Sequence, residues 1–154
     1  MRGEPSKSQC STLRVARIIL NIMSGSIDEE RSMIIDHIGL AVSDYNRSKE
    51  FFTRALAPLG IELVMEVEGW AGLGRAGKPE FWFGIHTQSQ ASMHIAFTAQ
   101  NREQVRAFHA AALAAGGKDN GPPGIREVYH PNYYGAFVIG PDGHNIEAVS
   151  HVAD

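Results

Sequence analysis

One supersecondary unit occurs twice in this chain, and the repeat is the strongest constraint on how the chain folds. The stretch from 36 to 60, DHIGLAVSDYNRSKEFFTRALAPLG, aligns without gaps with the stretch from 93 to 117, MHIAFTAQNREQVRAFHAAALAAGG. Internal repeats of this kind indicate one structural unit used twice. Each copy begins with a strand pattern and continues into a helix pattern. We therefore predict an α+β protein built from two βαβββ modules, each a curved mixed sheet of four strands backed by one helix.

The two modules are expected to pair, because neither can bury both faces of its sheet alone. Pairing would form a cleft lined by the curved sheets. Module 1 is expected at about 34–88 and module 2 at about 92–151, within one domain that spans 34–154.

Local signals place the elements of module 1. A run rich in β-branched residues from Ile34 to Val42 predicts the first strand. Ser43 or Asp44 can then cap a helix, because their side-chain oxygens satisfy free N–H groups of the first turn. An apolar face at helical spacing continues to Pro58-Leu59-Gly60, which ends the helix. Three further strands are predicted at 61–67, 70–74 and 79–85.

Module 2 is expected to close with a hairpin. After its helix, the sequence predicts a short strand around Lys118 and a Gly- and Pro-rich loop over 119–124. Runs suited to strands follow at Tyr133–Ile139 and His144–Val149. Between them lies Pro141-Asp142-Gly143, a signature of a tight turn in which Pro fixes φ and Gly tolerates positive φ.

Composition and charge exclude several classes of function. With 44% hydrophobic and 20% charged residues among 154, the chain has the composition of an ordinary globular domain. A net charge of -3 and the lack of a basic stripe argue against a nucleic-acid partner. No apolar run reaches the ~18 residues of a membrane span. The single cysteine, Cys10, allows no internal disulfide and suits a reducing compartment, so we expect a cytoplasmic protein.

The first 33 residues differ from the rest. They are polar as far as Ser11, and the apolar run from Val15 to Met23 is interrupted by Arg17 and Asn21. We expect residues 1–33 to be an N-terminal extension, flexible or with a short helix. Met33 directly precedes the first strand and is an alternative start of translation.

Two histidines and one carboxylate are candidates for chemistry. His37 and His94 occupy the same position in the two copies of the repeat, and Glu147 lies in an otherwise apolar strand. A buried carboxylate is costly unless a cation or a metal holds it, and the alternative is that it faces solvent. Either histidine alone is better explained as a hydrogen-bonded core residue. Together, two imidazoles and one carboxylate form a facial triad that leaves open positions on a divalent metal.

From about Ile35 to Val149, the chain resembles the vicinal oxygen chelate superfamily, which includes glyoxalases, bleomycin-resistance proteins and extradiol dioxygenases. The opening DHIGLAVSDYNRSKEFF resembles the start of a module, and the ending YYGAFVIGPDGHNIEAV resembles a closing strand. The intervening AAGGKDNGPPGIREVYHPNYYGAFV resembles an uncharacterised glyoxalase-like subgroup. The resemblance implies paired βαβββ modules with metal ligands on their first and last strands. Position by position, these ligands are His37, His94 and Glu147.

The sequence departs from the glyoxalase I pattern at the fourth ligand position. Matching Phe81-Trp82-Phe83 to Ile146-Glu147-Ala148 puts Trp82 where glyoxalase I has a glutamate. Tryptophan cannot ligate a metal, which leaves the three-ligand pattern of extradiol dioxygenases and fosfomycin-resistance thiol transferases. Trp82 could instead form the floor of a pocket and stack on a planar substrate, with ordinary core packing as the alternative.

Arg126, Tyr129 and Tyr134 lie just before or within the closing hairpin, where a loop could line the cleft. Arg126 could bind a substrate carboxylate or phosphonate through two parallel hydrogen bonds. Tyr129 or Tyr134 could donate to a developing oxyanion. Glu147, Tyr134 and Arg126 are therefore the candidate catalytic residues, and Trp82, Tyr129 and Tyr134 are the candidate pocket residues. For each loop residue taken singly, a solvated position is the simpler explanation.

The resemblance implies a metal-dependent glyoxalase-like enzyme that acts on a small oxygen-chelating substrate. Iron, manganese, zinc and nickel are all compatible with the ligand set, as are lyase or isomerase, dioxygenase and thiol-transferase reactions. The alternative is a non-enzymatic small-molecule binder of the bleomycin-resistance type, with Trp70, Trp82, Tyr133 and Tyr134 as candidate walls. A homodimer is expected, because open sheet edges favour association.

Overall fold

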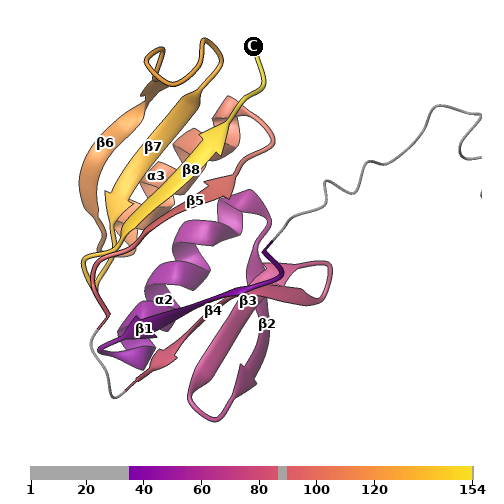
Figure 1. Ribbon diagram of the computed structural model, residues 1–154, viewed down its shortest axis with the longest axis vertical. Coiled ribbons are helices and arrows are strands. Elements are labelled where there is room, and N and C mark those ends of the chain that lie inside the picture. Colours follow the sequence, from indigo (N-terminus) through magenta and orange to yellow (C-terminus); the bar gives the residue numbers. More distant parts are fainter. Residues whose placement is uncertain (1–34, 87–89, 154) are drawn as a thin grey trace, which may run out of the picture. The chain divides into compact units, whose positions relative to one another are not determined.

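Helices and strands follow the repeat closely. The computed structural model describes residues 35–86 and 90–153. Module 1 consists of strand β1 (Ile38–Val42), helix α2 (Tyr45–Leu56), the 3₁₀ turn η1 (Ala57–Leu59), and strands β2 (Glu62–Val67), β3 (Trp70–Arg75) and β4 (Lys78–Ile85). Module 2 consists of β5 (His94–Thr98), helix α3 (Arg102–Ala114), β6 (Lys118–Ile125), β7 (Tyr134–Ile139) and β8 (Asn145–Ser150). Figure 1 shows the two βαβββ modules.

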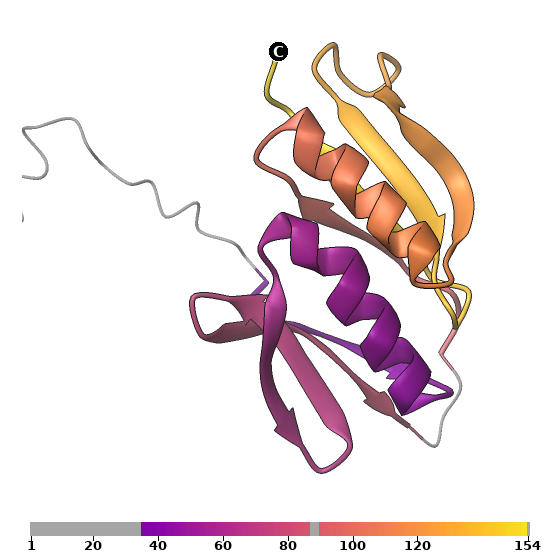
Figure 2. The same ribbon diagram turned by 180° about the vertical axis from the view of Figure 1, so that it is seen from behind.

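Each module forms one mixed sheet of four strands. The strand orders are β1-β4-β3-β2 and β5-β8-β7-β6. The first strand pairs in parallel with the last strand of its module, and the other pairs are antiparallel. A helix covers one face of each sheet, with α2 on the first and α3 on the second (Figure 2). The predicted α+β class and the two modules are therefore confirmed.

The start of α2 and the end of η1 use the signals that the sequence predicted. The Asp44 side chain accepts from Arg47 N at 3.0 Å and begins α2. Asn101 begins α3 in the same way by accepting from Gln104 N at 2.9 Å. Gly60 follows η1 with φ of 71°, which glycine adopts without steric cost.

The two modules share one hydrophobic core. Side chains of α2 and of β4 contribute most of its aromatic rings, and the ring of Phe81 lies 5.3 Å from that of Phe97 in β5. Helices α2 and α3 lie side by side in Figure 2. Phe51 reaches into module 2, where a Cβ added at Gly117 would lie 2.8 Å from its ring. The expected pairing of the modules thus buries apolar side chains from both.

Polar contacts add a second joint between the modules. The Asp142 carboxylate, in the turn between β7 and β8, accepts from Ser43 N at 2.7 Å and from Ser48 Oγ at 2.9 Å. Burial alone would raise the pKa of Asp142, but these hydrogen bonds and His144 lower it below its usual value. The His144 side chain, only 2% exposed, accepts from Met93 N at 3.0 Å and donates to Ala41 O at 3.4 Å.

Strand β6 differs from the prediction. Instead of a short strand and a loop, residues 118–125 form one strand at the edge of the second sheet. Its register with β7 shifts between Asp119 and Gly121 and again between Gly121 and Gly124. These bulges accommodate Pro122 and Pro123, which lack N–H groups and are tolerated on an edge strand.

The predicted N-terminal extension, residues 1–33, lies outside the described residues. Residues 35 and 36 precede the first module. Among the described residues, no helix is long and apolar enough to cross a membrane.

Candidate functional site

Glu147 is the only carboxylate among the described residues that is almost fully buried. It lies in β8, between Ile146 and Ala148, which face the helix side of the sheet and belong to the core. Because side chains alternate along a strand, Glu147 points to the opposite, open face. Its residue exposure is nevertheless only 1%. The alternative that Glu147 faces solvent is therefore wrong, and its burial requires hydrogen-bonding partners.

Two side chains satisfy the Glu147 carboxylate. The Tyr133 hydroxyl donates to Oε1 at 2.5 Å, and His94 Nε2 lies 2.8 Å from Oε2. An ionised carboxylate can only accept, so the imidazole donates as well. The His94 side chain is 54% exposed, whereas that of Glu147 is 1% exposed. The pair thus connects a buried negative charge to a ring that solvent and ligands can reach.

Backbone hydrogen bonds and ring contacts fix the position of Tyr133. Its N–H donates to His130 O at 2.9 Å, and its carbonyl accepts from Arg126 N at 2.8 Å. Its ring lies 5.1 Å from those of Tyr129 and His151. Burial and the hydrogen bond to Glu147 raise the pKa of the Tyr133 hydroxyl, so that it remains a donor at neutral pH.

Gly135 makes room for this arrangement. A Cβ at Gly135 would lie 2.9 Å from Glu147 Oε1 and 3.1 Å from the Tyr133 ring. Sequence reasoning assigned neither Tyr133 nor Gly135 to the metal site. The only signal available was their place in the closing hairpin, since the contacts themselves arise across strands.

His37 is not brought to His94 and Glu147 within one chain. His144 bridges Ala41, near the end of β1, to Met93, just before β5. His37 lies four residues before Ala41, at about 3.3 Å per residue or roughly 13 Å along the strand direction. His37 and His94 therefore lie toward opposite ends of β1 and β5, the neighbouring edge strands of the two sheets. Among residues 35–86 and 90–153, no three His, Cys, Asp or Glu side chains are grouped to hold a metal.

Trp82 occupies the position in module 1 that Glu147 occupies in module 2. In the parallel ladders, Gly39 pairs with Trp82 as Ala96 pairs with Glu147. The equivalence derived from the repeat is therefore correct. The indole rests on Gly72, where an added Cβ would lie 2.9 Å from its ring.

Trp70 lies on the same open face of module 1. An added Cβ would be 2.4 Å from the Trp70 ring at Gly84 and 3.7 Å at Gly39. Glycines in β3 and β4 therefore let two partly exposed indoles lie against the sheet. This face can offer flat apolar contacts but no fourth metal ligand from Trp82.

Arg126 lies on the Glu147 side of module 2. Its guanidinium is 5.5 Å from the centre of the Phe137 ring and donates to Pro122 O at 2.7 Å. The His94 ring lies 6.1 Å from the same phenylalanine. Phe137 is paired with Glu147 in the β7–β8 ladder. Arg126 has no ion pair with a carboxylate among the described residues, so its charge is available to an anionic group.

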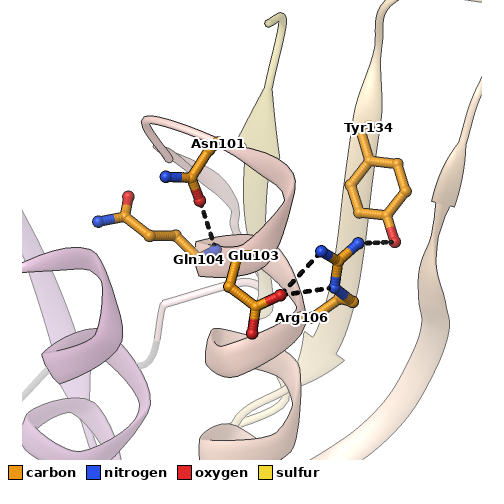
Figure 3. Close-up of polar contacts among 5 residues, drawn as sticks. All are labelled: Asn101, Glu103, Gln104, Arg106 and Tyr134. Atoms are coloured by element: carbon orange, nitrogen blue, oxygen red, sulfur yellow. Dashed lines mark hydrogen bonds and ion pairs between the residues drawn. The ribbon is translucent and has the colours of Figure 1, made fainter. Parts of the chain in front are cut away.

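The remaining predicted site residues lie elsewhere. The Tyr129 side chain is 66% exposed and reaches the site only through its ring contact with Tyr133. Tyr134 points to the helix side, where its hydroxyl accepts from Arg106 at 3.5 Å (Figure 3). The Arg102 guanidinium lies 5.2 Å above its ring. Tyr134 is thus turned away from Glu147, and we assign it no part in the site.

Comparisons with known proteins give a consistent picture. The family model described as Glyoxalase/Bleomycin resistance protein/Dioxygenase superfamily matches residues 34–148. A glyoxalase/bleomycin resistance protein from Albidiferax ferrireducens T118 is 32% identical over 74% of this chain and 96% of that chain, with a TM-score of 0.66. No curated protein gave a match.

Two further solved structures share the fold at lower identity. A glyoxalase-related enzyme from Fulvimarina pelagi is 19% identical over 77% of this chain and 88% of that chain, with a TM-score of 0.59. A glyoxalase I mutant from Zea mays is 22% identical over 75% of this chain and 46% of that chain, with a TM-score of 0.57.

Proposed function

Since the chain belongs to the Glyoxalase/Bleomycin resistance protein/Dioxygenase superfamily, we propose that it is a metal-dependent enzyme acting on a small molecule with two neighbouring oxygen atoms. The observation that carries this proposal is the pairing of buried Glu147 with exposed His94. A buried carboxylate beside an accessible imidazole supplies two ligands of the kinds that commonly bind a divalent metal. Superfamily members bind small molecules and are often metal-dependent.

The donor atoms fit a divalent ion. Ligands of one ion at about 2.1 Å can lie about 3 Å apart, and His94 Nε2 and Glu147 Oε2 are 2.8 Å apart. Both atoms are of types that iron, manganese, zinc and nickel accept. When bound, the ion would act as a Lewis acid that stabilises negative charge on the substrate oxygens. His94 and Glu147 would hold it, with Tyr133 bonded to the other carboxylate oxygen.

We propose that His37 completes the site from a second copy of the chain. Within one chain His37 stands away from His94, but it is exposed and alternates onto the open face of module 1 with Gly39 and Ala41. If the open face of module 1 from one copy covers that of module 2 from another, His37 can approach His94 and Glu147. A twofold axis then generates two equivalent sites, which makes a homodimer the expected assembly.

Arg126 gives the proposed site a preference for an anionic substrate. Its guanidinium is held by the Pro122 carbonyl and lies over the Phe137 ring, which the His94 ring also contacts. A carboxylate or phosphonate on the substrate would pair with it in a bidentate manner. Tyr129, whose ring contacts that of Tyr133, would contact the outer part of such a substrate. Lyase or isomerase, dioxygenase and thiol-transfer reactions all suit this arrangement.

The test of the proposal is metal uptake by the full chain, purified without a histidine tag and stripped with a chelator. Wild type, His37→Ala, His94→Ala and Glu147→Ala are each incubated with Fe²⁺, Mn²⁺, Zn²⁺ or Ni²⁺ and desalted, and bound metal is counted. His109→Gln is the matched control, because the imidazole of His109 on α3 pairs with Asp119 on β6 and not with Glu147. We expect about one ion per chain in wild type and in the control, and loss in the three variants. Wild type that retains none of the four ions would refute the metal-dependent function.

A second candidate function rests on the two indoles of module 1. Trp70 and Trp82 lie on glycines of the open face, an arrangement suited to stacking on a planar ligand. In that case the protein would sequester an aromatic or cationic compound without a metal. Quenching of tryptophan fluorescence by such compounds in chelator-treated wild type, reduced in Trp82→Leu, would favour this binder over the enzyme.

A further inference from the structure

The carboxylate of Glu147 has its two oxygens assigned to different partners. Oε1 takes the Tyr133 hydroxyl at 2.5 Å, and Oε2 takes His94 at 2.8 Å. The two partners also differ in access, because His94 is half-exposed and Tyr133 lies partly beneath the surface. Oε2 therefore lies on the side of the accessible His94 ring, and Oε1 lies on the side of Tyr133.

The contact between Oε1 and Tyr133 depends on Gly135 in β7 and on the loop that precedes β7. Gly135 leaves the space in which Oε1 and the Tyr133 ring lie, 2.9 Å and 3.1 Å from where a Cβ would be. The backbone of Tyr133 is hydrogen-bonded in both directions, to His130 O and from Arg126 N. The hydroxyl is thus fixed independently of any group that binds on the outer side.

We propose that Tyr133 is a positioning residue that restricts Glu147 to a single outward ligand oxygen, Oε2. This inference rests on the proposed metal-dependent function. With Oε1 occupied by the hydroxyl, Glu147 binds a cation through one oxygen only and leaves a coordination position for substrate. Without the hydroxyl, the carboxylate is free to rotate or to bind through both oxygens. Partners that orient a ligand commonly change metal affinity about 10–100-fold when removed.

The experiment compares Tyr133→Phe with Tyr45→Phe in the full chain. Tyr45 is the matched control, because its hydroxyl also donates to a glutamate, Glu66, but in module 1. Affinity for Zn²⁺ is measured by calorimetry on chelator-treated protein, and the ligand set is followed by the absorption spectrum of bound Co²⁺. We expect about 10–100-fold weaker Zn²⁺ binding and an altered Co²⁺ spectrum in Tyr133→Phe alone. Wild-type affinity and spectrum in Tyr133→Phe would overturn the inference.

A second variant separates the orientation of the Glu147 carboxylate from the loss of the Tyr133 hydroxyl. Gly135→Ala keeps the Tyr133 hydroxyl but places a methyl group 2.9 Å from Oε1, so that the carboxylate must shift, and we expect it to weaken Zn²⁺ binding as well. It also serves if Tyr133→Phe does not fold.

A metal-free measurement separates failure of this inference from failure of the proposed function. If wild type binds no metal, the proposed function fails, and positioning is judged from the ¹⁵N signals of the His94 ring in the metal-free protein. Tyr133→Phe should shift these signals, because a mobile carboxylate no longer fixes the Nε2–H tautomer, and Tyr45→Phe should leave them in place. Unchanged His94 signals in Tyr133→Phe would overturn the inference on their own.

Discussion

His94 and Glu147 meet across the parallel β5–β8 ladder, with Nε2 and Oε2 separated by 2.8 Å. His94 is not opposite Glu147 in this ladder, since Ala96 is, and its ring reaches along the strand to the carboxylate. A buried charge is costly in isolation, so the pair and the Tyr133 hydroxyl must be considered together.

Removing the Tyr133 hydroxyl should destabilise the metal-free protein. Hydrogen bonds to charged groups contribute about 1.5–3 kcal/mol, and Tyr133→Phe leaves a buried carboxylate oxygen without its donor. We expect the free energy of unfolding in urea to fall by about that amount. Tyr45→Phe should change it little, because Glu66 is exposed and keeps Lys49 as a partner. Equal stability of Tyr133→Phe and wild type would contradict the assigned contact.

The joint at Asp142 should make stability depend on pH in the acid range. Its pKa is lowered from 3.8 in the folded chain by the Ser43 and Ser48 hydrogen bonds, which outweigh the effect of burial. A lowered folded-state pKa means that the stabilisation is complete above about pH 4 and is lost as the pH falls through the folded value. Wild type should therefore melt at a higher temperature than Asp142→Asn at pH 7. The difference should shrink below about pH 4, and a constant difference from pH 7 to pH 2 would argue against this joint.

A methyl group at Gly84 should disturb the face that carries the indoles. The added Cβ would lie 2.4 Å from the Trp70 ring, and overpacking of this kind costs about 1–3 kcal/mol. Gly39→Ala is the matched control in the adjacent strand, because its Cβ would meet the same ring at an ordinary 3.7 Å. We expect Gly84→Ala alone to lower the urea midpoint and to shift tryptophan emission. If both variants behave alike, Trp70 does not lie against β4.

Much of the fold could be predicted from local signals. The repeat, the cap at Asp44 and the turn at Pro141-Asp142-Gly143 act within a few residues, so they can be recognised in the sequence. Glu147 could also be identified, because a carboxylate in an apolar strand requires a special environment. Strand β6 could not, because its bulges depend on pairing with β7 rather than on its own proline-rich sequence.

The contacts of the site were harder to predict, because they join residues from different elements. Tyr133 was considered only as the wall of a metal-free cleft, whereas its hydroxyl bonds to Glu147. Tyr134, its neighbour, points to α3 because side chains alternate along β7. His144 was expected only as the first residue of the last strand, but its side chain bridges the two modules. The orientation of the modules, which separates His37 from His94, has no signature in the sequence.

The central claim is that His37 of one copy joins His94 and Glu147 of another. The most direct test mixes equal amounts of His37→Ala and Glu147→Ala chains by refolding them together, and counts bound metal. Neither variant alone has a complete site, but each mixed dimer regains one. With random pairing, about a quarter of the sites are restored, so the account predicts about one ion per four chains. A mixture that binds no more metal than either variant alone, while wild type binds one ion per chain, would contradict the shared site.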